Sequence, residues 1–158
     1  MEYTRSEILA AREAWIEYLM NPHRRKYRGK LANPKRCDER CCLGHGMHLF
    51  YGLKYVNGSY QHKGEDGKAT FDFVEKVGLW NRIGRIENDH SVGTLRDIEK
   101  FVGKFVLAEF GRNVKELDSL TRVNDWTRTS PQRIGEYLLH VIEGGEDTPF
   151  RPLSDYSE

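Results

Sequence analysis

Apolar side chains recur at helical spacing near both ends of the chain. At the N-terminal end, Thr4 and Glu7 have the spacing of a capping box, and the apolar repeat then runs to Asn21. Near the other end, Ser130 followed by Pro131 is typical of a helix N-cap and first turn, and an apolar stripe continues from there to a glycine pair. The pattern predicts a helix at each of these places.

Two further helices are predicted in the interior of the chain. Leu43, Met47 and Phe50 share one face of a short helix that follows the cysteines. Farther along, a threonine N-cap and a glycine stop enclose an apolar stripe that predicts a helix over 95–110.

Strand signals are confined to short stretches. β-prone residues flank Asn57-Gly58, a strong signal for a tight hairpin. We expect a small antiparallel sheet near 27–31, 54–62 and 69–73. Together with the helices, this predicts an α+β fold of about four helices packed around a small antiparallel sheet.

Length and composition favour one domain. A chain of 158 residues with 38% hydrophobic residues can bury a single core. We therefore expect one globular domain over 1–145. The remaining residues, 146–158, carry prolines and clustered acids and are predicted to form an extended C-terminal tail over the surface.

The charge balance excludes two classes of protein. Lys and Arg number 25 against 24 for Asp and Glu, a net charge of +1, so neither a uniformly basic nucleic-acid coat nor an acidic nucleic-acid mimic fits. The three cysteines, two of them adjacent, argue against a disulfide framework and favour a reducing compartment. The N-terminus lacks a signal-peptide layout and no stretch has the roughly 20 apolar residues of a membrane span. We expect a cytoplasmic protein without membrane contact.

A set of short motifs is spread over the chain. The most specific is Cys41-Cys42-Leu43-Gly44, and the others are Trp15, Leu19, Val77-Gly78-Leu79, Asn124-Asp125, Ser130-Pro131 and Ile134-Gly135-Glu136-Tyr137-Leu138. Together these anchors resemble a family of short uncharacterised proteins of phages and prophages. The chain departs from the family in having His45 where a branched aliphatic residue is usual, and in a longer insert between Trp80 and Val123. The resemblance implies a viral protein of the bacterial host cytoplasm, mostly helical with a small sheet. It implies no catalytic residues.

Positive charge is concentrated in one segment, 23–40, where only two acids stand against the basic residues. Clustered guanidinium groups suit phosphate recognition, and an aromatic ring among them offers a face on which a base can stack. The predicted ligand-binding residues are Arg24, Arg25, Lys26, Tyr27, Arg28, Lys30, Arg36 and Arg40. We expect binding without catalysis, with a nucleotide, a nucleic acid or a host protein as the partner. The alternative interpretation of this segment is a solvated surface stretch.

The cysteine–histidine run 37–48 is the alternative candidate for a functional site, either a metal site or a thiol active site. Cys41, Cys42, His45 and His48 offer sulfur and nitrogen ligands that suit zinc, with His62 or His90 as a distant complement. The same cysteines could also serve a thiol enzyme. There Arg36 or Arg40 would favour the thiolate, and His45 or His90 would act as the base.

Two simpler interpretations stand beside these. Unpaired cysteine is among the most buried residue types, so Cys41 and Cys42 are predicted to lie buried at a strand-to-helix junction, with no metal and no cofactor. Asn124-Asp125 is predicted to close the turn before the last helix. A structural or oligomeric interaction protein is the third functional alternative.

Overall fold

The computed structural model describes residues 3–27, 38–52, 54–56, 59–61, 66–79, 124, 129–140 and 150–158. Four α-helices are present in this part of the chain. They are α1 (Arg5–Met20), α2 (Cys42–Tyr51), α3 (Asp66–Val77) and α6 (Pro131–His140). The predicted helix over 95–110 lies outside the described residues.

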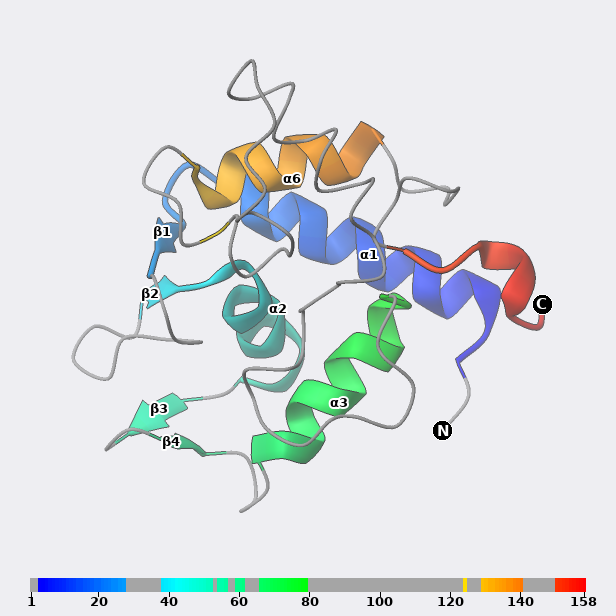
Figure 1. The fold of residues 1–158 in the computed structure, drawn as a ribbon, viewed down its shortest axis with the longest axis horizontal. Coiled ribbons are helices and arrows are strands. Elements are labelled where there is room, and N and C mark those ends of the chain that lie inside the picture. The colour runs from blue at the N-terminus through cyan, green and yellow to red at the C-terminus, as the bar shows by residue number, and fades with distance from the viewer. Residues whose placement is uncertain are drawn as a thin grey trace, which may run out of the picture.

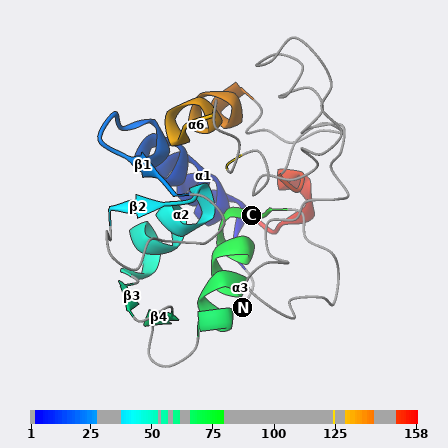
Figure 2. The ribbon, with the colours of Figure 1, turned by 60° about the vertical axis from the view of Figure 1, so that its left-hand side comes forward.

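The central helix, α1, contacts α6 on one side and α2 and α3 on the other, as Figures 1 and 2 show. Its N-terminus is capped as predicted, since Oγ1 of Thr4 accepts from the backbone N–H of Glu7 at 3.3 Å. The close approach of α6 depends on Gly135, where an added Cβ would lie 2.7 Å from Cγ of Met20 and 3.2 Å from the carbonyl oxygen of Ile16.

The core lies where α1, α2 and α3 meet. Its fully buried side chains include Trp15, Phe73 and Phe150, and the rings of the latter two pack edge-on against Trp15 at centroid distances of 5.2 and 6.3 Å. Gly46 of α2 faces this cluster, because an added Cβ would lie 2.9 Å from Nε1 of Trp15. Ile134 and Leu138 of α6 are buried as well.

The strands form two separate pairs instead of one antiparallel sheet. β3 (Lys54–Val56) and β4 (Ser59–Gln61) are the antiparallel hairpin predicted around Asn57-Gly58. β1 (Arg25–Lys26) and β2 (Glu39–Arg40) pair in parallel. The described part of the fold is therefore mostly helical, and the prediction of a single antiparallel sheet is wrong.

The third predicted strand, 69–73, lies inside helix α3 and is also wrong. The alternation Phe71-Asp72-Phe73 is strand-like, but Phe73, Val74 and Val77 have helical spacing and all three are buried. The helix ends before Gly78. This residue has φ 65°, and the N–H of Leu79 donates to the carbonyl of Val74 at 3.1 Å, closing the helix end.

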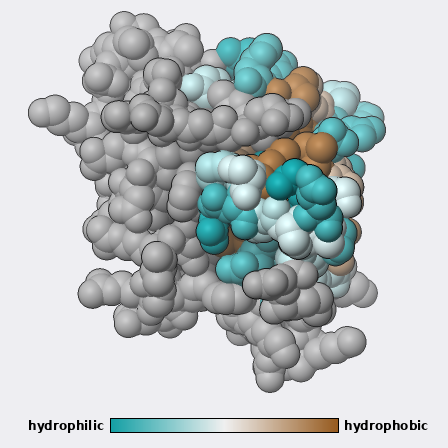
Figure 3. Space-filling model, turned by 90° about the vertical axis from the view of Figure 1, so that its right-hand side faces the viewer, coloured by the Kyte–Doolittle hydropathy of each residue, from teal (hydrophilic) through white to brown (hydrophobic). Residues whose placement is uncertain are grey.

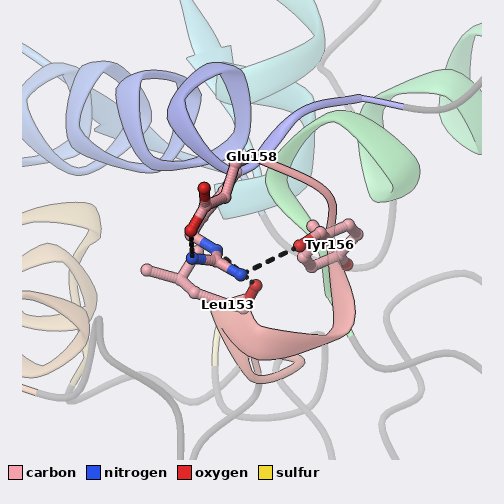
Figure 4. A network of polar contacts seen from close by, with 4 residues as sticks. Leu153, Tyr156 and Glu158 are labelled. Atoms are coloured by element: carbon pink, nitrogen blue, oxygen red, sulfur yellow. Dashed lines mark hydrogen bonds and ion pairs between the residues drawn. The ribbon is translucent and has the colours of Figure 1, made fainter.

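The last residues of the chain pack against the first helix. Phe150 is fully buried and forms an antiparallel bridge with Leu79. The guanidinium of Arg5 donates to the carbonyl oxygens of Leu153 (3.1 Å) and Tyr156 (3.2 Å) and pairs with Glu158 at 3.2 Å (Figure 4). The stretch 150–158, with the 3₁₀ turn η2 (Leu153–Asp155), is thus held to α1 and to Leu79, which follows α3. Phe150 is buried, whereas 151–158 are half-buried or exposed, and 146–149 lie outside the described residues.

The face on the side of the termini is largely hydrophilic where its residues are described, with small hydrophobic areas between the polar ones (Figure 3). Among the described residues, Leu139 is the large apolar side chain that stands exposed, with 47% of its surface accessible. None of the described helices is long and apolar enough to cross a membrane.

Candidate anion-binding site

The strand pair β1–β2 brings the two ends of the basic segment together. Its parallel register places Arg25 beside Glu39 and Lys26 beside Arg40, and the N–H of Tyr27 donates to the carbonyl of Arg40 at 3.1 Å. Residues 24–27 and 38–40, although separated in sequence, therefore form one surface beside the start of α2 (Figures 1 and 2). Arg28, Lys30 and Arg36 lie outside the described residues.

The described members of the basic segment have different environments. Arg25 is the most exposed, with 56% of its side chain accessible and its Nε 3.7 Å from a carboxylate oxygen of Asp38. Lys26 donates from Nζ to the carbonyl oxygen of Thr129 at 2.8 Å. Arg40 is buried, with 7% of its surface accessible. Burial of Arg40 makes it a structural cation under the surface instead of the exposed contact that the sequence suggests.

Arg24 stacks on a ring that the sequence did not assign to the site. Its guanidinium carbon lies 3.4 Å from the centroid of the Tyr18 ring, and its Nε donates to the Tyr18 carbonyl at 3.0 Å. The other neighbours of Tyr18 are His45 and His48 of α2, with ring centroids 5.8 and 6.5 Å away. Tyr18 therefore links the basic segment to the histidines.

The cysteines lie at the junction of β2 and α2, buried as predicted. Cys41 is the N-cap of α2, and its sulfur accepts from the N–H of Gly44 at 3.3 Å. The carbonyl of Cys42 accepts from Nε1 of Trp15 at 2.9 Å. No group of three or more His, Cys, Asp or Glu side chains in the described part of the chain is arranged to hold a metal ion. Cys37, His62 and His90 lie outside that part.

Asn124 has a structural role that its sequence position does not suggest. It is fully buried, accepts from the N–H of Cys42 at 3.1 Å and donates from Nδ2 to the carbonyl of Tyr27 at 3.0 Å. It thus holds the end of β1 against the first turn of α2. Residues 125–128, which lead toward α6, lie outside the described residues, so the predicted role of Asn124-Asp125 in the turn before α6 stays a prediction. Its partners are 82 and 97 residues away in sequence, so no local pattern predicts such a bridge.

His45 lies beneath the strand pair. It is fully buried, and its Nε2 is 2.7 Å from the carbonyl oxygen of Arg25. The pKa of His45 is lowered from 6.5 to about 4, chiefly by burial and in part by its electrostatic interactions with Arg40, Arg24 and His48, against the raising effect of the hydrogen bond with the Arg25 carbonyl. The imidazole is therefore neutral at pH 7.

No family model, curated protein or solved structure matches the chain. The resemblance to the phage and prophage proteins therefore stays a prediction from its sequence anchors.

Proposed function

We propose that this protein binds a phosphate-bearing ligand, a nucleotide or a nucleic acid, through the basic segment 24–40, without catalysing a reaction on it. The observation that carries the proposal is the convergence of positive charge beside α2. The strand pair joins the two ends of the segment and places Lys26 beside Arg40, while Arg25 is exposed and Arg24 stacks on the ring of Tyr18.

Cationic residues outnumber acids in this part of the chain. The strand pair places Lys26 beside Arg40 in register. Within 24–27 and 38–40, the sequence has four cationic residues, Arg24, Arg25, Lys26 and Arg40, and two acids, Asp38 and Glu39. A phosphate group, whose oxygens carry negative charge and accept hydrogen bonds, suits a cluster of this composition.

The backbone near the exposed residues is held in place. Tyr27 is bound through its N–H to Arg40 and through its carbonyl to Asn124. Its side chain is half-buried. An aromatic ring whose backbone is fixed beside exposed cations suits base stacking, because little conformational freedom is lost on binding. A phage origin and action in the host cytoplasm belong to the same proposal.

The test is the affinity for a fluorescein-labelled oligothymidylate and for ATP, measured by fluorescence anisotropy and competition. The variant Arg25→Gln with Arg28→Gln removes two cations of the segment. Arg133→Gln is the matched control, because Arg133 lies on α6, outside the basic segment, has 52% of its side chain accessible and forms a surface ion pair with Glu136. We expect the double variant to bind at least tenfold more weakly, about 1.4 kcal/mol, and the control to bind like wild type. Equal affinity of wild type and double variant would overturn the proposal.

A further inference from the structure

His45 carries a buried nitrogen that has no partner. Nδ1 is inaccessible to solvent and makes no hydrogen bond with the part of the chain that the structure describes. Leaving a buried acceptor unsatisfied costs about 1–3 kcal/mol, and such a group in a folded protein calls for an explanation.

The other ring nitrogen determines what Nδ1 can do. Nε2 lies 2.7 Å from the carbonyl oxygen of Arg25, and a carbonyl oxygen only accepts hydrogen bonds. Nε2 must therefore carry the proton. In the neutral ring, Nδ1 then presents a lone pair and acts only as an acceptor. Its missing partner is a donor, either O–H or N–H.

Cationic residues and a half-buried ring lie near the imidazole of His45. Arg40 comes from β2, Arg24 from the residues before β1, and His48 from the next turn of α2. Tyr18 of α1 and His48 are half-buried, and the ring of Tyr18 lies near both histidines. Because both rings are partly accessible to solvent, we expect a ligand group to reach Nδ1 by displacing one of them.

We infer that Nδ1 of His45 accepts a hydrogen bond from the ligand, so that the site selects a phosphate ester carrying an O–H or N–H donor, as a nucleoside phosphate does, over bare phosphate. This inference rests on the proposed function and adds the ligand class to it. The phosphate part and the nucleoside part of the ligand contact different groups of the protein. Phosphate oxygens are repelled by the lone pair of Nδ1 and pair with the cations, whereas a sugar hydroxyl or a base amino group is attracted to Nδ1.

The test compares ATP with inorganic tripolyphosphate, which offers a similar chain of phosphates and no nucleoside. Two-dimensional ¹H–¹⁵N spectra of the histidine rings report the Nδ1 resonance of His45 directly. We expect ATP to bind about tenfold more tightly, the effect of one hydrogen bond, and to move the Nδ1 resonance in the direction of an accepted hydrogen bond. Tripolyphosphate should leave it in place. The exposed His140, at the end of α6, is the internal control.

The outcomes separate this inference from the proposed function. If both compounds bind and the Nδ1 resonance does not respond to ATP, or if both bind equally tightly, the inference is overturned and the proposed function stands. If neither compound nor the oligothymidylate binds, the proposed function fails and the inference fails with it. His45→Phe gives a second measurement, in which ATP affinity should fall by a larger factor than tripolyphosphate affinity. Equal losses would indicate a purely structural role and overturn the inference.

Discussion

His45 shows how one side chain can combine a structural contact with a functional constraint. Its Nε2–H holds the backbone of Arg25, while burial and neighbouring cations keep the ring neutral. The sequence suggested a metal or acid–base role from the spacing of Cys41, His45 and His48. It could not show that Nε2 is engaged by a carbonyl twenty residues away in sequence, because that contact depends on the strand pair.

The low pKa of His45 predicts a pH dependence of stability. Because the folded value, about 4, lies below the ordinary 6.5, the native state binds fewer protons than the unfolded state between these values. Its contribution is fully present above pH 6.5 and is lost as the pH falls toward 4, in total about 3 kcal/mol. Urea unfolding of wild type and His45→Gln at neutral and acidic pH measures this. An equal acid-induced loss in both proteins would contradict the assignment.

Gly46 gives a second prediction, in which packing opposes helix propensity. In an open helix, replacing Gly by Ala stabilises by about 1 kcal/mol. Here the new Cβ would collide with the ring of Phe73 and crowd Nε1 of Trp15. We expect Gly46→Ala to lower the free energy of unfolding by about 1–3 kcal/mol, measured by urea unfolding. A variant more stable than wild type would show that this contact is loose.

Arg12 is a buried charged residue whose burial could have been predicted from its position on the helix. It lies four residues from both Ile8 and Ile16, within the apolar stripe of α1, and is fully buried. Its guanidinium donates to the carbonyls of Val77 (2.7 Å) and Arg151 (2.7 Å). A charged residue inside an apolar stripe is the sequence signal for such a buried cap, although its partners are set by the tertiary fold.

At the scale of elements, local signals succeeded where a cap or turn specifies the structure. The first helix, the hairpin around Asn57-Gly58 and the start of α6 at Ser130 are all as predicted, and Oγ of Ser130 accepts from the N–H of Arg133 at 3.2 Å. The failures, α3 and the β1–β2 pair, depend on tertiary contacts. Phe73 is helical because its burial against Trp15 outweighs local strand preference, and two-residue strands have no recognisable period.

Replacing Asn124 tests whether the candidate site depends on the hydrogen bonds that join β1 to α2. Asn124→Ala would leave the N–H of Cys42 and the carbonyl of Tyr27 without this partner. With two buried groups affected, we expect a loss of about 2–4 kcal/mol in unfolding free energy, together with weaker ligand binding. Thr4→Ala, which removes an exposed cap far from the site, should cost about 1 kcal/mol and leave binding unchanged. An Asn124→Ala variant with nearly the same free energy of unfolding as wild type and with normal ligand binding would argue against this bridge.

At the scale of the whole molecule, both ends of the chain are part of one structure. The N–H of Arg5 donates to the carbonyl of Ser157 at 2.7 Å, and Phe150 lies in the core beneath the guanidinium of Arg12, 4.5 Å from its ring centroid. The sequence predicted a surface tail because prolines and acids dominate the composition there. Phe150 is a single apolar residue in this stretch and forms no periodic pattern, so its burial could not be predicted from the sequence.

Removing Phe150 should therefore affect the whole domain. We expect Phe150→Ala to cost about 3–5 kcal/mol, since the change leaves a cavity beside Trp15. Glu158→Gln removes only the exposed pair with Arg5 and should cost less than about 1 kcal/mol. Thermal and urea unfolding of both variants measure the difference. If Phe150→Ala unfolds like wild type, the last residues are not part of the cooperative unit.

The measurement that tests the central claim most directly is the salt dependence of oligothymidylate binding. If phosphates pair with cations of the segment 24–40, the logarithm of affinity should fall linearly with the logarithm of salt concentration. The slope should become shallower by about one to two in Arg25→Gln with Arg28→Gln and stay unchanged in Arg133→Gln. An affinity that does not change with salt concentration, or a slope that is the same in all three proteins, would contradict the account.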